Sequence, residues 1–119
     1  MTTEELINLN LGFLIEEHGF TFEFYDEHGS HYIFKNANGH IEFFEWEQFK
    51  DHCIFVKCGT NEREMQLYYE YPEIFKRFQE THKGFKWFFK DERPDYWAMV
   101  SDIVRNEIKT KNSIFGLNI

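Results

Sequence analysis

The sequence lacks every short motif that marks a catalytic or cofactor site. Its seven glycines are dispersed and form neither a GxGxxG nor a GxxxxGK phosphate-binding loop. None of Ser30, Ser101 and Ser113 lies in the Gly-x-Ser-x-Gly turn that presents a nucleophilic serine. Carboxylate pairs such as Glu16-Glu17 are common in an acidic chain, so no general acid-base pair stands out. The sequence therefore predicts no catalytic residue and no cofactor, and it favours a protein that is not an enzyme.

Long apolar runs and an N-terminal export signal are also missing. No stretch approaches the roughly 18 consecutive apolar residues of a membrane-spanning helix. The first five residues, Met-Thr-Thr-Glu-Glu, lack the basic start of a signal peptide. We therefore expect a cytoplasmic protein with no membrane partner. Only two prolines occur, 42% of the residues are hydrophobic and 29% are charged, which predicts one folded domain over residues 1–119.

Cysteine is scarce, and its spacing argues against a metal site. Cys53 and Cys58 are the only two thiols, so we expect both to be reduced and to form no disulfide. His52 could add a third zinc ligand, but structural zinc sites usually present paired CxxC turns. A strand between Cys53 and Cys58 would separate the two thiols by about 15 Å. His28 and His31 span an expected turn and are interpreted as surface residues. We predict no bound metal.

Basic residues are few, and the charge is unevenly distributed. The net charge is −8. Residues 1–81 hold sixteen acids and six Lys or Arg, which gives −10, whereas residues 82–119 hold five acids and seven Lys or Arg, which gives +2. Duplex binding depends on clustered Lys and Arg, so the acidic majority argues against it. The same charge is compatible with a basic protein partner, although solubility alone also explains it.

One segment combines basic and aromatic residues. Residues 83–90 read Lys-Gly-Phe-Lys-Trp-Phe-Phe-Lys, and such a stretch can stack bases on its rings while its lysines neutralise phosphates. Asp91 and Glu92 follow directly and oppose phosphate binding. We interpret the segment as an aromatic plug whose lysines reach water along their stems, and we expect no nucleic-acid partner.

The hydrophobic periodicity predicts an α+β fold. Thr2 and Glu5 have capping-box spacing, and Gly19 supplies a stop, which indicates an N-terminal helix over residues 3–18. The period then changes to two, and turns such as Asn36–Gly39 separate the strands. The expected antiparallel meander sheet has five to six strands, over residues 20–25, 32–35, 40–47, 53–57 and 64–69, with residues 85–90 as a sixth strand or a loop.

Two further helices are expected to pack on this sheet. Pro72 fits the first turn of a short helix over residues 72–79, whose apolar side carries Ile74, Phe75 and Phe78. A long C-terminal helix begins near Asp95, and the tail over residues 113–119 is apolar enough to pack back on the domain. The apolar row of the long helix consists of Trp97, Val100, Val104 and Ile108, with Ile103 beside it.

Aromatic residues are abundant, with fifteen Phe, six Tyr and three Trp, and several are adjacent in the sequence. Because neighbouring strand residues point to opposite faces, pairs such as Phe43-Phe44 indicate that both sheet faces are covered. One predicted face, the core face, carries Phe20, Phe22, Phe24, Tyr32, Phe34, Ile41, Phe43, Ile54, Val56, Met65, Leu67 and Tyr69. The opposite face carries Tyr25, Ile33, Phe44, Trp46, Phe55 and Tyr68 among Glu23, Lys35, Glu42, Lys57 and Gln66.

Two long helices cover about one face of such a sheet. Five strands at about 4.8 Å spacing give a width of roughly 20 to 25 Å, and each helix is about 10 Å across. The second face is closed by the helix over 72–79, the segment 85–90 and the tail, or by strong curvature of the sheet, or else it binds a second copy, another protein or an apolar ligand. In the binding interpretation, the candidate partner-binding residues are Phe44, Trp46, Phe55 and Tyr68, since Tyr and Trp ringed by polar residues are typical of an interface centre.

These features favour a non-enzymatic, cytoplasmic protein-interaction module. Its partner would be another protein or a second copy of the chain, as in a homodimer. In size, acidity, aromatic richness and lack of motifs, the chain is similar in character to the small immunity proteins that neutralise bacterial toxins. The alternative hypothesis is a small-molecule-binding domain or small enzyme with a pocket between the sheet and the helices.

Overall fold

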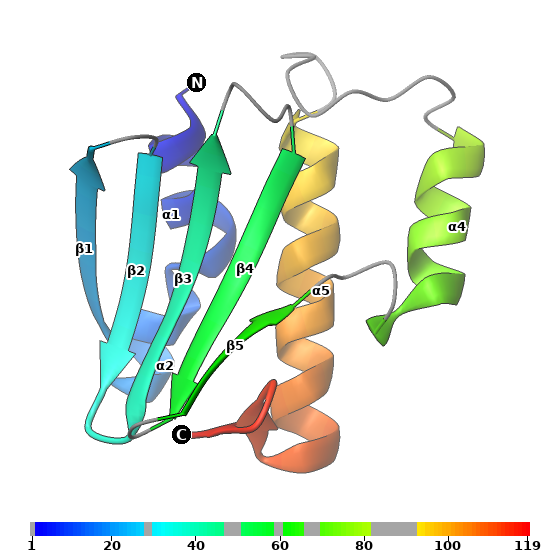
Figure 1. The fold of residues 1–119 in the computed structure, drawn as a ribbon. Coiled ribbons are helices and arrows are strands. Elements are labelled where there is room, and N and C mark those ends of the chain that lie inside the picture. Colours follow the sequence, from blue (N-terminus) through cyan, green and yellow to red (C-terminus); the bar gives the residue numbers. More distant parts are fainter. Residues whose placement is uncertain (1, 28–29, 47–50, 59–60, 66–69, 82–92) are drawn as a thin grey trace.

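The computed structural model describes residues 2–27, 30–46, 51–58, 61–65, 70–81 and 93–119. These segments form helices and an antiparallel sheet, so the predicted α+β class is confirmed (Figure 1). Within them, no helix is both long enough and apolar enough to cross a bilayer. The strand or loop predicted over residues 85–90 lies outside the described ranges.

The chain opens with two short helices, α1 (Thr3–Leu11) and α2 (Phe13–His18). The predicted capping box is present at the start of α1. The Thr2 hydroxyl accepts a hydrogen bond from the backbone N–H of Glu5, and the Glu5 carboxylate accepts one from the backbone N–H of Thr2, both at 3.1 Å. These bonds satisfy two amide groups that a helix start otherwise leaves without acceptors.

The single helix predicted over 3–18 is wrong, because the chain is interrupted at Gly12. The backbone N–H of Gly12 donates to the carbonyl of Asn8 at 2.9 Å, and a Cβ added at Gly12 would lie only 2.4 Å from that oxygen. Only glycine therefore permits this close approach. The predicted stop is confirmed at Gly19, whose φ of 70° ends α2 in the left-handed conformation.

Five described strands pair antiparallel in chain order, and β1 and β5 are the outermost of them. The described sheet has five strands, the possible sixth strand over 85–90 lies outside the described residues, and two further short strands near the C-terminus form a separate ribbon that was not predicted. Residues 66–69, the end of the predicted fifth strand, lie outside the described ranges. The strands are β1 (Thr21–Asp26), β2 (Ser30–Asn36), β3 (Gly39–Trp46), β4 (Asp51–Cys58) and β5 (Asn61–Met65).

Helices α1, α2 and α5 (Arg93–Lys111) lie behind one face of the sheet (Figure 1). We call this the inner face and its opposite the outer face. Side chains fill the layer between the sheet and these helices. Phe43 of β3 meets Trp97 of α5 edge to face, with ring centroids 5.6 Å apart, and neither is exposed. The predicted apolar row of the C-terminal helix is also confirmed, since Val100 and Val104 are buried beside Trp97.

Helix α4 (Pro72–Thr81) does not lie on the sheet as predicted. In Figure 1 it stands beyond α5, on the side away from β1, and Phe78 packs edge to face on Tyr96 of α5 at 6.0 Å between centroids. The apolar side of α4 was read correctly, because Ile74 and Phe75 also pack against the core. Its periodicity specified which side is buried, but α1, α2 and α5 already occupy the inner face.

The C-terminal tail packs back on the domain, as expected, and forms a small ribbon of β6 (Ser113–Ile114) and β7 (Leu117–Asn118). Ile114 and Leu117 are fully buried. The ribbon is attached to the turn between β2 and β3, where the amides of Asn36 and Asn38 donate to the Asn118 carbonyl at 2.8 and 3.0 Å. The tail therefore covers one end of the core.

Glu107 of α5 is a buried carboxylate, 2% exposed, that joins three segments. It accepts hydrogen bonds from the Tyr71 hydroxyl, from Lys111 Nζ at 2.7 Å and from the backbone N–H of Phe115 at 3.0 Å. Burial alone would raise the pKa of Glu107, but the bonds from Lys111, Tyr71 and Phe115 hold that pKa below its ordinary value. Burial and the Glu107 carboxylate raise the pKa of Tyr71 to about 12.

Candidate functional site

The outer face carries a row of rings that crosses three strands. Tyr25 of β1 is paired in register with His31 of β2, and His31 is paired with Phe44 of β3. Directly paired residues on antiparallel strands lie on the same face, so the register brings these three side chains together. We call Tyr25, His31 and Phe44 the aromatic row.

The rings of this row are in contact. His31 lies nearly parallel to Tyr25, with centroids 4.2 Å apart and planes 11° apart. On its other side it meets Phe44, at 4.6 Å and 49°. The imidazole is therefore held between two aromatic rings from neighbouring strands, which is a specific cross-strand packing arrangement.

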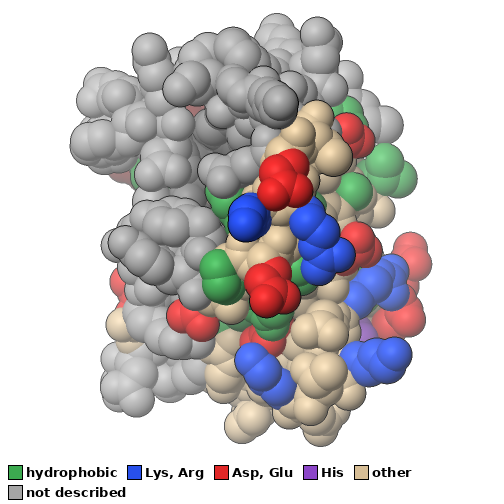
Figure 2. Space-filling model, turned by 90° about the vertical axis from the view of Figure 1, so that its right-hand side faces the viewer, with side chains coloured by type: hydrophobic (Ala, Val, Ile, Leu, Met, Phe, Trp, Pro, Cys, Tyr) green, Lys and Arg blue, Asp and Glu red, His purple; other side chains and the backbone are tan. Residues whose placement is uncertain are grey.

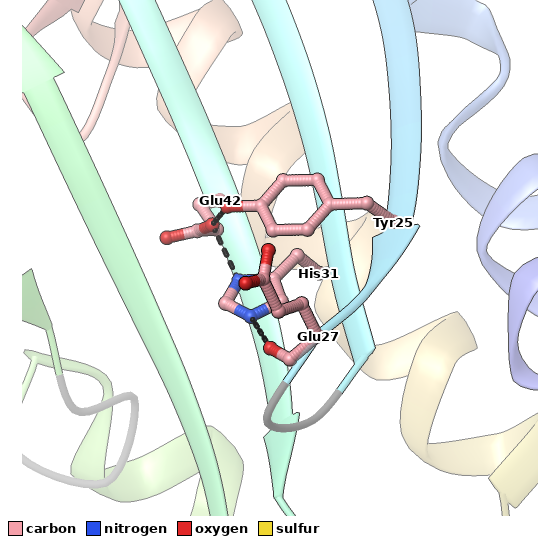
Figure 3. Close-up of polar contacts among 4 residues, drawn as sticks. All are labelled: Tyr25, Glu27, His31 and Glu42. Atoms are coloured by element: carbon pink, nitrogen blue, oxygen red, sulfur yellow. Dashed lines mark hydrogen bonds and ion pairs between the residues drawn. The ribbon is translucent and has the colours of Figure 1, made fainter.

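Polar contacts fix the same histidine from both ends (Figure 3). Nε2 lies 3.0 Å from the carbonyl oxygen of Glu27, and Nδ1 lies 2.8 Å from Oε1 of Glu42. A carbonyl only accepts, so Nε2 carries a proton and donates it. When Nδ1 is protonated as well, the ring donates at both nitrogens and forms an ion pair with Glu42.

Tyr25 is bound to the same carboxylate. Its hydroxyl donates to Glu42 Oε1 at 3.2 Å, beside the bond from His31. Partial burial of the phenol, the negative charge of Glu42 and this hydrogen bond raise the pKa of Tyr25. The phenol therefore stays protonated and donating at neutral pH, and Glu42 connects β1, β2 and β3 through one oxygen.

The side chains of the row and of Glu42 differ in exposure to solvent. Tyr25 is 41% exposed, whereas the side chains of His31 and Glu42 are 16% exposed. Ile33, the next outer-face residue on β2, is 6% exposed. An ion pair between Lys35 and Glu23 at 2.9 Å flanks it. The described outer face is thus a packed surface whose most accessible ring is Tyr25.

The four predicted binding residues are described by the structure to different extents. Phe44 lies on the outer face, half-buried against His31. Trp46 belongs to β3, and Phe55 is paired with Glu42 in the register of β3 and β4, but the side chains of both lie outside what the structure describes. Tyr68 lies outside the described residues. Phe44 stays a candidate binding residue, and the structure places it in one row with Tyr25 and His31.

The interpretation of His31 as a surface turn residue is wrong. Strand β2 begins at Ser30, not at Tyr32, so His31 is a strand residue in the middle of the row. Its role depends on partners from β1 and β3, which local spacing does not reveal. A predicted second strand that began at residue 30 would have placed His31 on the same face as Tyr25 and Phe44. His28 lies outside the described residues.

The arrangement does not favour acid-base catalysis. A histidine that acts as a general base needs one nitrogen directed at the substrate. In His31, Nδ1 faces Glu42 and Nε2 faces the Glu27 carbonyl, so both nitrogens are engaged within the protein. The bonded side chains of His31 and Glu42 are therefore suited to linking strands β1, β2 and β3.

Metal ligands do not gather in the described part of the chain, where no group of three or more His, Cys, Asp and Glu side chains is placed to hold an ion. Cys53 and Cys58 both lie on β4, five positions apart, which separates their Cα atoms by about 16 Å. Their side chains are outside what the structure describes, and the absence of a metal stays a prediction.

Comparison of the chain with protein-family models, with curated proteins and with solved structures found no match. An assignment of function therefore depends on the residues of the outer face and on their geometry.

Proposed function

We propose that the protein is a non-enzymatic, cytoplasmic interaction module that binds a protein partner through the outer face of its sheet. Toxin neutralisation, as in immunity proteins, is one form that this function takes. The observation that supports the proposal most directly is the aromatic row, which lies on the face opposite α1, α2 and α5 with Tyr25 41% exposed.

The row has the properties of a binding surface that is ordered in advance. The Tyr25 ring is fixed by its stack on His31 and by its bond to Glu42, so little side-chain freedom is left to lose on association. A rigid tyrosine supplies a large contact area together with a hydroxyl that bonds at the margin. Phe44 extends the apolar surface toward the middle of the sheet.

The alternative, a ligand pocket between sheet and helices, receives less support. In the described part of the protein this layer is filled by side chains such as Phe34, Ile41 and Phe43, which are fully buried together with Trp97. The outer face is therefore the better candidate for binding.

The proposal is tested with the wild-type chain as bait in a lysate of the source organism, beside Phe44→Lys. A partner that binds the outer face is retained by wild type and lost from Phe44→Lys, since a lysine at an interface centre must lose its water on binding. Leu9→Lys is the matched control, because Leu9 is 68% exposed on α1, behind the inner face. Equal recovery on all three baits, with folded protein shown by circular dichroism, contradicts the proposal.

A further inference from the structure

The first part of the chain carries acidic residues but no basic residues of its own. Residues 1–34 contain no Lys or Arg, and they build α1, α2, β1 and most of β2. Cations reach this region only from elsewhere, as when Lys35 pairs with Glu23 at 2.9 Å and Arg105 approaches Glu17 at 3.9 Å. The acidic residues of the region are Glu4, Glu5, Glu16, Glu17, Glu23, Asp26 and Glu27.

The opposite side of the molecule is different. Figure 2 looks at the right-hand side of Figure 1 and shows acidic and basic side chains intermixed over its described surface. Apart from Lys35, the basic side chains that the structure describes all come from α4 and α5: Lys76, Arg77, Arg105, Lys109 and Lys111. The charge of the β1 side is thus a local property and not an even coating for solubility.

Strand β1 is also an open edge. It ends the sheet, and β2 is its one partner among the described strands. Half of the backbone N–H and C=O groups of an edge strand point away from the sheet and can pair with another chain. Phe24 and Tyr25 are neighbours on this strand, one on each face, and each is 41% exposed. The prediction that Phe24 lies on the core face is confirmed, but its side chain is not buried, because no described strand lies beyond β1 to cover it.

A strand added beside β1 would cover both of these rings. Phe24 stacks on Tyr32 at 5.2 Å, and Tyr25 stacks on His31 at 4.2 Å, so the neighbouring strand β2 holds one fixed ring on each face of the edge strand. Addition of an extended segment to such an edge is a common mode of peptide recognition, in which backbone bonds give affinity and alternate side chains give specificity.

Charge decides between a second copy and a different partner. Two β1 strands side by side would bring Glu23, Asp26 and Glu27 of both copies to one seam. Among the described residues, Lys35 pairs with Glu23, while the exposed carboxylates of Asp26 and Glu27 have no cationic partner. Like charges across neighbouring strands destabilise the pairing, and opposite charges favour it.

We infer that the β1 edge binds an extended, Lys- or Arg-bearing segment of a partner protein as an added strand. The apolar side chains of that segment pack on Phe24 or Tyr25, and its basic side chains lie against Asp26 and Glu27. The inference rests on the proposed function and extends it, because it names the chemistry of the partner and places one contact on the sheet edge.

The probe is an acetylated and amidated peptide of alternating Lys and Val, six residues long, titrated into the isotope-labelled protein and followed by NMR. We expect chemical-shift changes that concentrate on Thr21–Asp26. The same peptide with its alternate backbone nitrogens methylated keeps its charge but loses one edge of hydrogen bonds, so binding is lost. The double variant Asp26→Asn, Glu27→Gln weakens binding roughly threefold per charge. Glu73→Gln, Glu80→Gln on α4 makes the same charge change as a control.

Three results overturn the inference. The first is shift changes that avoid β1, and the second is equal binding of the methylated and unmethylated peptides. The third is a dimer in sedimentation whose β1 amides become protected, which would place a second copy on the edge. Any of these, together with a captured partner that is lost from Phe44→Lys, removes the edge inference and leaves the proposed function in place. If Phe44→Lys still retains the captured partner while the peptide binds at β1, the proposed function is wrong and the edge inference stands.

Discussion

The imidazole of His31 lies parallel to the phenol ring of Tyr25, 4.2 Å away, and both side chains bond to the same oxygen of Glu42. This pair joins β1 to β2, and Glu42 joins both to β3. The geometry of the exposed Tyr25 ring therefore depends on a histidine that is itself mostly covered.

Replacement of His31 by alanine tests this dependence. His31→Ala removes the stack and two hydrogen bonds and leaves the Glu42 carboxylate without its imidazole donor, so we expect a loss of about 1 to 3 kcal/mol in the free energy of unfolding. Urea denaturation measures the loss. His40→Ala, on the outer side of β3, is the matched control and should cost less. A His31→Ala midpoint equal to that of wild type would show that the contacts are incidental.

The C-terminal helix is expected to be integral to the fold. Trp97 is fully buried against Phe43 and Tyr96, so Trp97→Ala should reduce the free energy of unfolding by about 3 to 5 kcal/mol. Thermal and urea denaturation both measure this change. Leu9→Ala, at an exposed position, should change little. An unchanged thermal midpoint for Trp97→Ala would show that α5 is not packed as described.

Glu107 gives a prediction about pH. Its folded-state pKa is lowered, so its stabilising effect is present above the unfolded value of about 4.3 and is lost as pH falls through the folded value. We expect Glu107→Gln to be less stable than wild type at neutral pH by about 1 to 3 kcal/mol, because a charged hydrogen-bond acceptor is removed. The difference between the two proteins should shrink below pH 4.3. Glu73→Gln on α4 serves as the exposed control, and a difference that does not vary with pH contradicts the prediction.

The purified protein is expected to contain no stoichiometric zinc. The separation of Cys53 and Cys58 along β4 is too large for two ligands of one tetrahedral ion. Elemental analysis of untagged protein measures the metal directly. One zinc per chain, lost together with stability in Cys53→Ser, would show that the prediction is wrong.

Local signals in the sequence predicted much of the fold. The capping box at Thr2 and Glu5 and the stop at Gly19 depend on contacts a few residues apart, and the row around Trp97 follows the helical spacing of apolar residues along α5, so local patterns suffice to predict them. At the interruption, the Asn8 carbonyl oxygen lies where a Cβ of residue 12 would be, and only the three-dimensional course of the backbone reveals this.

The candidate site was predicted less completely. Alternation assigned Phe44 to the outer face, but the contact partners of His31 come from two other strands and from a turn carbonyl. The position of α4 beside α5 likewise follows from competition for the inner face, since α1, α2 and α5 already cover it. An amphipathic pattern specifies a buried side without specifying the surface that buries it.

Partner binding through the outer face is the central claim, and the affinity of Trp46→Lys for the purified partner tests it most directly. Trp46 continues the alternation of Phe44 along β3. Titration calorimetry gives the affinity, and circular dichroism with thermal denaturation reports the fold. We predict that Trp46→Lys keeps the wild-type spectrum and thermal midpoint and loses binding at least roughly tenfold, or about 1.4 kcal/mol. A folded Trp46→Lys protein that binds the partner with wild-type affinity would contradict the claim.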